Sequence, residues 1–112
     1  MSSPKLGRRL VLEQPTRMAD GAGGFVSGWS ALGVIWAAID PGSLRISAQP
    51  AAGEARLPLR ITVRGAPVGA PSRPQPGQRF RDGSRVYPIS SVSLSDASGR
   101  YLLCVAYEEA AL

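Results

Sequence analysis

The clearest strand signal in the sequence is Leu57-Pro-Leu-Arg-Ile-Thr-Val-Arg64. Its aliphatic residues occupy every second position, and proline, arginine and threonine stand between them. Successive side chains of a strand point to opposite faces, so this alternation predicts a strand with one face in a core and the other in solvent. Pro58 has no backbone N–H to donate, which indicates an edge strand or the start of a strand.

Two further strands are predicted on the N-terminal side. Arg8–Glu13 places Leu10 and Leu12 on one face, the pattern of a half-buried strand. Trp29–Ile39 is rich in β-branched and aromatic residues and predicts a strand with a bulge near Gly33.

The C-terminal half carries a hairpin and a final strand. Asp82-Gly83 separates two β-prone runs, as in a two-residue hairpin, and the second run continues as a strand over 86–94. Residues 100–108 are apolar on both faces, which is typical of a central strand.

Turns and loops separate these strands. Glycines in Asp20–Gly24 permit a tight reversal, and four prolines in Ala66–Gly77 indicate a semi-rigid, extended connector. Pro41–Arg56 is a long excursion of small residues with two prolines and two glycines, and loops of this length are usually functional or disordered.

Together these signals predict an all-β fold, a small β-barrel of five to six short antiparallel strands with one long inserted loop. The 112 residues suffice for one domain, and 13 glycines and 10 prolines fit short strands joined by many turns. We expect a flexible N-terminal arm at 1–7, a barrel domain at 8–109 with the long loop at 41–56, and a C-terminal tail at 110–112.

The net charge of +5 comes almost entirely from arginine, with Lys5 as the single lysine. The guanidinium group pairs well with phosphates and carboxylates, so DNA or an acidic protein face is a plausible partner. Arginine-rich coding in a GC-rich genome explains the excess equally well. The sequence shows no signal peptide and no apolar run near the ~20 residues of a membrane helix, so we expect a cytosolic protein that does not contact a membrane.

Catalysis finds little support in the residue types. The chain has no histidine, and its acidic residues are mostly single: Asp20, Asp82 and Asp96 stand in turn sequences, where Asx-turns are the better interpretation. Glu108 and Glu109 are adjacent in a predicted strand and therefore point to opposite faces. The lone Cys104 lies in an apolar run, which predicts a buried core thiol. We therefore expect no enzyme, no catalytic residue, no metal site and no cofactor.

Five stretches resemble one protein family in their order and spacing: Arg8–Glu13, Asp20–Phe25 with Trp29 and Ile35–Ala37, Leu59–Arg64, Arg79–Gly83 with Val86–Ile89, and Arg100–Cys104. They are similar to the head–tail adaptor or head-completion (stopper, head closure) proteins of long-tailed phages, and particularly to their relatives in bacterial gene transfer agents. The resemblance covers nearly the whole chain.

The resemblance implies a structural connector in the neck of a phage-like particle that assembles in the bacterial cytoplasm. Its subunits would form a homo-oligomeric ring, expected to be a hexamer, between a portal-adaptor protein and a tail terminator or tail tube. The long loop would project inward and gate the channel for packaged DNA. The expected channel-loop residues are Pro41, Gly42, Ser43, Arg45, Gln49, Glu54 and Arg56. The expected contacts to DNA or to neighbouring subunits are Arg45, Arg56, Arg60 and Arg64. The family has no catalytic residues and no cofactor.

The alternative is a small β-barrel that binds nucleic acid as a monomer. Arg60 and Arg64 share a strand face, and Arg79, Arg81 and Arg85 flank the predicted hairpin. Barrels that bind single strands add aromatic side chains for base stacking, whereas most aromatics here stand where a core needs them. For the arginine-bearing face, a solvated or interfacial charged surface is therefore favoured over a DNA-reading one. A third possibility for the function is a neighbouring connector component, either the adaptor or the tail terminator.

Overall fold

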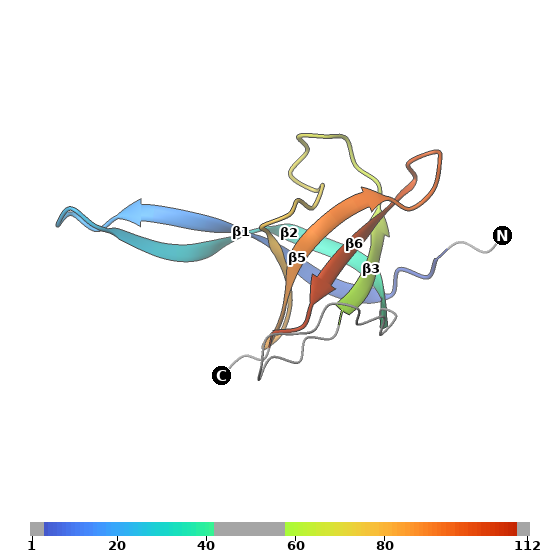
Figure 1. Ribbon diagram of the computed structural model, residues 1–112, viewed down its shortest axis with the longest axis horizontal. Helices are drawn as coiled ribbons and strands as arrows, with labels where there is room; N and C mark the ends of the chain where they lie inside the picture. The colour runs from blue at the N-terminus through green and yellow to red at the C-terminus, as the bar shows by residue number, and fades with distance from the viewer. Residues whose placement is uncertain (1–3, 42–57, 110–112) are drawn as a thin grey trace, which may run out of the picture.

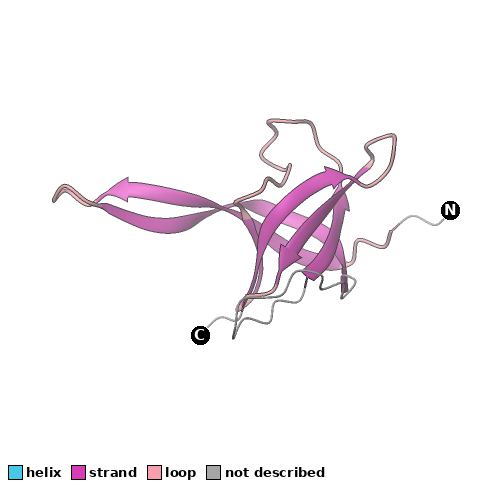
Figure 2. Cartoon of the chain, viewed as in Figure 1, coloured by secondary structure: helices cyan, strands magenta, loops and turns pink. Residues whose placement is uncertain are grey.

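The computed structural model describes residues 4–41 and 58–109, which form six antiparallel strands (Figures 1 and 2). The strands are β1 Arg8–Ala19, β2 Phe25–Pro41, β3 Pro58–Arg64, β4 Arg79–Asp82, β5 Arg85–Leu94 and β6 Tyr101–Tyr107. They pair in the order β1-β2-β3-β6-β5-β4, and pairing of β4 with β1 closes the sheet into a barrel. The predicted all-β barrel is confirmed. Within the described ranges there is no helix that is long and apolar enough to cross a membrane.

The core fills the barrel with the inward side chains of alternating strands. On β3, Leu59, Ile61 and Val63 are buried, as the alternation predicts, and Pro58 begins the strand. On β6, every second residue is likewise buried, and the strand lies between β3 and β5, which confirms its central position. The buried apolar residues are Leu10, Leu12, Ala37, Leu59, Ile61, Val63, Phe80, Tyr87, Ile89, Leu102, Cys104 and Ala106.

A β-bulge interrupts the pairing of β1 with β2. Leu12 pairs with Gly33 and Glu13 with Ala31, so Leu32 is an extra residue on β2. Gly33 has a φ of +152°, a conformation that side chains disfavour, and Leu32 packs against the core. The predicted bulge near Gly33 is confirmed, and it lies where β1 and β2 leave the barrel.

Beyond the bulge, β1 and β2 form a projecting arm, which we define as residues 14–30 (Figure 1). Pairing of β1 with β4 stops at Glu13, so from Gln14 onward the ribbon has only two strands. At its tip, Asp20 Oδ1 accepts hydrogen bonds from the backbone N–H groups of Ala22 and Gly24, at 2.8 and 3.0 Å. The turn is as predicted, but both flanking strands extend further than predicted. The arm has no core to face, so its residues do not alternate regularly between apolar and polar, and this is why the prediction ended the strands too early.

Tight connections complete the barrel. The predicted hairpin is confirmed, but its two-residue turn is Gly83-Ser84, one residue beyond the predicted Asp82-Gly83, because Asp82 still pairs with Arg85; Gly83 has a φ of +62°. Asp82 does not follow the predicted Asx-turn: its carboxylate pairs with Arg8 at 2.6 Å, across the seam between β1 and β4. Asp96 does cap its turn, because it accepts hydrogen bonds from Ser98 and from the backbone N–H of Tyr101.

The connector between β3 and β4 folds back on itself instead of running extended. Three backbone hydrogen bonds, from residue 70 to 67, 73 to 70 and 78 to 75, close successive turns, and Pro74 is buried beneath them. At its start, Gly65 lies against the backbone of Gly99 and Arg100, and a Cβ at position 65 would collide with the Gly99 carbonyl oxygen. The predicted extended conformation is therefore wrong, because turn hydrogen bonds form between the prolines.

Candidate functional site

The root of the arm is fixed by a buried carboxylate. Glu13 lies opposite Arg79 in the register of β1 and β4, and its side chain is 6% exposed. Arg79 Nε donates to Glu13 Oε1 at 2.7 Å, and Arg81 Nε lies 3.1 Å from Oε2. The Arg79 guanidinium also stacks 4.0 Å from the centre of the Trp29 ring. Both oxygens of Glu13 are thus occupied by arginines, an arrangement that holds strands together and leaves no free carboxylate for proton transfer.

The arm carries large apolar side chains that the rest of the described chain does not cover. Met18, Phe25, Val26 and Trp29 are 42–70% exposed. Arg17 lies over Phe25, with its guanidinium carbon 3.9 Å from the ring centre, in the same way as Arg79 lies over Trp29. Arginine stacked on aromatic rings, with exposed aliphatic neighbours, is the composition found at the centre of protein interfaces.

The structure places three of the residues expected to contact DNA or line the channel. Arg60 and Arg64 are exposed on the outward face of β3, as the alternation predicts. Pro41 is the last residue of β2 and pairs with Leu59. The remaining predicted channel residues lie outside the described ranges: Gly42, Ser43, Arg45, Gln49, Glu54 and Arg56. Pro58, where β3 begins, pairs with Tyr107, so both ends of the segment 42–57 lie at the end of the barrel where β6 terminates.

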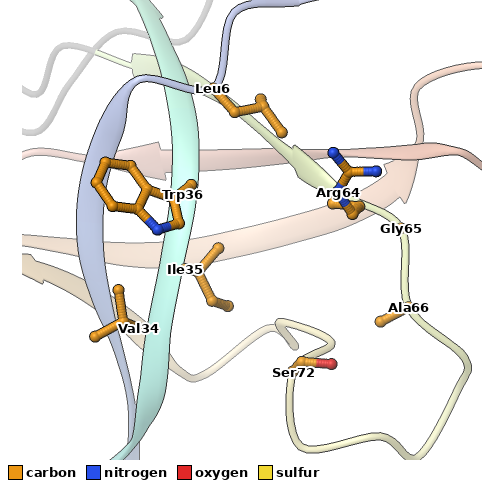
Figure 3. Close-up of a pocket in the computed structure, with 8 residues that line it drawn as sticks. All are labelled: Leu6, Val34, Ile35, Trp36, Arg64, Gly65, Ala66 and Ser72. Atoms are coloured by element: carbon orange, nitrogen blue, oxygen red, sulfur yellow. The ribbon is translucent and has the colours of Figure 1, made fainter.

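A hollow of about 430 Å³ lies between β2 and the start of the β3–β4 connector (Figure 3). Leu6 and Ile35 point into it, and Val34 and Trp36, which extend from the other side of β2, border it. Its lining residues are Leu6, Val34, Ile35, Trp36, Arg64, Gly65, Ala66 and Ser72. One arginine and one serine among apolar groups provide packing and a positive rim, with no acid–base pair for a reaction.

Turn hydrogen bonds and burial shift the pKa of several side chains. Backbone N–H groups of Ala22 and Gly24 lower the pKa of Asp20, and the Ser98 hydroxyl lowers the pKa of Asp96. Burial raises the pKa of the Cys104 thiol to about 12, which keeps it protonated and confirms a core thiol. Among residues 4–41 and 58–109, no three histidine, cysteine or acidic side chains gather as metal ligands would.

Comparison with protein families gives a match over nearly the entire chain. The model of the phage head completion protein family matches residues 1–109. The chain belongs to this family. Membership confirms the resemblance that the strand and turn pattern indicated.

Two solved structures resemble this head completion protein over nearly the whole of each chain. One is a chain of the virion of a native gene transfer agent particle, with 46% identity and a TM-score of 0.80 over 98% of this chain and 100% of that chain. The other is protein SF1141 from Shigella flexneri 2a, with 21% identity and a TM-score of 0.72 over 98% of each chain, which shows a shared fold. No curated protein matches this chain.

Sequence reasoning missed the arm and the ion pairs at its root. A usable signal for the arm was present: the reversal at Asp20–Gly24 implies that the residues flanking it pair with each other, and the flanks already contained the strands at Arg8–Glu13 and Trp29–Ile39. The Glu13 contacts had no comparable signal, because Arg79 and Arg81 are distant in sequence and approach only when β4 closes the barrel.

Proposed function

We propose that this head completion protein is a non-enzymatic head-closure (stopper) subunit of a phage or gene transfer agent. In this proposal, copies of the barrel form a ring, expected to be a hexamer, in the neck between the portal-adaptor protein and the tail terminator or tail tube. Assembly takes place in the bacterial cytoplasm, and segment 42–57 of each copy projects towards the ring axis and restricts the passage of packaged DNA.

The observation that carries the proposal is where segment 42–57 is anchored. Its two ends, Pro41 and Pro58, belong to neighbouring strands that pair with each other, so the segment leaves and re-enters the barrel at one end. A segment anchored in this way does not interrupt the closed sheet. Arg45 and Arg56 within it and a net charge of +5 suit contact with phosphate groups.

The test is to replace residues 43–54 with a glycine–serine segment of equal length, which preserves the reach of the segment and removes its side chains. We expect an intact barrel by circular dichroism, particles that still contain the protein, and loss of DNA from filled heads before tails attach. A matched control replaces the exposed connector residues Pro67–Gly69, which lie on a different loop. Unchanged DNA retention in the 43–54 variant would exclude the gating role.

One observation favours the alternative, a barrel that binds nucleic acid as a monomer. Arg64 pairs in register with Tyr101, so an exposed arginine and a partly exposed tyrosine lie side by side on the outer surface. This function predicts that the isolated chain binds single-stranded DNA, that affinity falls steeply with salt, and that Arg60→Ala together with Arg64→Ala reduces the salt dependence. The stopper proposal predicts weak or no binding by the isolated chain.

A further inference from the structure

One long apolar row runs along the outward face of β2, which we call the β2 stripe: Phe25, Trp29, Val34 and Trp36. The register places Trp36 opposite Arg9, Val34 opposite Val11, Trp29 opposite Pro15 and Phe25 opposite Ala19. These four partners share one face of β1, so the four β2 side chains also share one face. The odd spacing between Trp29 and Val34 is compensated by the extra residue Leu32 at the bulge. The four side chains are 42–58% exposed. The stripe begins on the barrel wall and continues along the arm, so the chain's own barrel cannot cover its outer half (Figure 1).

A second apolar row runs along the outward face of β6, which we call the β6 stripe: Tyr101, Leu103, Val105 and Tyr107. Its members alternate with the core residues of the strand and are each partly exposed. Ser91 and Ser93 of β5 pair with Val105 and Leu103 and border the stripe with small polar groups. Aromatic and aliphatic side chains in one exposed row are the composition found at the centre of protein interfaces.

The two stripes face different directions on one closed barrel. In the strand order, β3 separates β2 from β6 on one side, and β1, β4 and β5 separate them on the other. A copy therefore cannot bring its own stripes together, but it offers one of each to its neighbours. Two different surfaces on every subunit are what a head-to-tail contact requires, and such contacts generate a ring when the rotation between copies closes.

Charge distribution favours the same pairing. Arg17 stacks over Phe25 and Arg81 lies beside the root of the arm, so the β2 stripe has a positive border. The β6 stripe ends in Glu108 and Glu109, both exposed. Glu108 lies 3.6 Å from Arg85, an exposed pair that costs little to rearrange. Arg60 and Arg64 of β3 lie beside Val105 and Tyr101, so the β6 stripe is acidic only at its Glu108–Glu109 end, and the positive border of the β2 stripe complements that end.

We propose that the β2 stripe of one copy packs against the β6 stripe of a second copy, and that this head-to-tail contact builds the ring. The inference rests on the proposed function, because it names the surfaces through which the stopper subunits associate. The aromatic and arginine side chains of the arm supply the anchor residues, and the barrel wall of the next copy supplies the surface that buries them. The arm, a two-stranded ribbon of marginal stability by itself, gains support from the same contact.

Cysteine cross-linking within assembled particles tests this contact. Ser27 lies on the β2 stripe between Phe25 and Trp29, Ser93 borders the β6 stripe, and both are exposed. The native Cys104 is buried, so we expect no reaction with a surface reagent. Particles assembled with the double variant Ser27→Cys/Ser93→Cys, treated with a short bismaleimide, should yield a ladder of covalent multimers up to the full ring on a denaturing gel.

Each single variant should give no multimers, and neither should Ser27→Cys combined with Ser84→Cys, a residue exposed in the β4–β5 turn. Dimers from Ser27→Cys alone would indicate a two-fold contact between arms and overturn the inference. Absence of the ladder from particles that contain the double variant in normal amount would also overturn it while the stopper role stands. Absence of the wild-type protein from the particle neck would instead refute the proposed function, and the inference would fall with it.

Discussion

Replacement of Glu13 by glutamine tests whether the buried ion pairs hold the arm to the barrel. Glu13→Gln keeps the size of the side chain and removes its charge. The variant leaves Arg79, whose side chain is 19% exposed, without a counter-charge, whereas Arg81 is 46% exposed and can be hydrated. Almost all of the effect should therefore come from the Glu13–Arg79 pair.

The burial of each partner sets the expected magnitude. Removal of one partner from a fully buried ion pair costs about 3–5 kcal/mol, and exposed pairs contribute about 0–1 kcal/mol. Arg79 retains some contact with water and keeps its stacking on Trp29, so the cost should be lower than for full burial. We expect Glu13→Gln to reduce the free energy of unfolding by about 2–3 kcal/mol. For a domain of this size, the thermal midpoint should fall by roughly 10 °C or more.

Urea unfolding of the wild type, Glu13→Gln, Arg79→Gln and the double variant measures the effect and the coupling between the two residues. The coupling free energy should be about 1–2 kcal/mol. Glu108→Gln is the matched control: its partner Arg85 is 3.6 Å away and both side chains are largely exposed, so the change should be within about 0.5 kcal/mol. A Glu13→Gln variant as stable as this control would refute the role assigned to the ion pairs.

Three further predictions concern single positions. Gly65→Ala brings a methyl group against the Gly99 carbonyl oxygen, so the free energy of unfolding should fall by about 1–3 kcal/mol. Urea titration measures this change, and an unchanged free energy of unfolding would show that the connector can shift to make room. The lowered pKa of Asp20 means that its turn hydrogen bonds contribute stability above the ordinary aspartate pKa and lose it as the pH falls through the lowered value. The protection factors of the Ala22 and Gly24 amides, which correct for the intrinsic pH dependence of exchange, should therefore fall only in that acidic range, and protection factors that do not change with pH would contradict this. The Cys104 thiol, with a pKa raised to about 12, should resist a thiol reagent at pH 8 in the folded chain and react after addition of urea; rapid reaction in native buffer would refute its burial.

Much of the barrel could be predicted because a core imposes a local pattern. Leu59, Ile61 and Val63 alternate with polar residues, and Gly83 occupies a turn position that requires positive φ, so their placement follows from nearest neighbours in the sequence. The arm could not be recognised in this way, because a ribbon with solvent on both faces needs no alternation. Its strand residues include Pro15 and Gly28, which disfavour strand formation when considered singly.

In the candidate site, too, only the features that a local sequence pattern determines could be predicted. The shared outward face of Arg60 and Arg64 follows from the alternation of β3 and is observed. The contact of Glu13 with Arg79 and the pairing of Asp82 with Arg8 arise when β4 closes the barrel against β1, and no short-range pattern encodes that closure. The exposed β2 stripe has strand-like composition in the sequence, but only the strand order shows that its outer half has no core to face.

Electron microscopy of particles that carry a labelled copy of the chain tests the central claim most directly. A small epitope inserted at the exposed β5–β6 turn, near Ala97, avoids the arm, both stripes and segment 42–57. A head-closure ring predicts antibody density at the neck, arranged around the channel axis between head and tail. Labelled protein along the tail, on the capsid surface or only in the unassembled fraction would contradict the account.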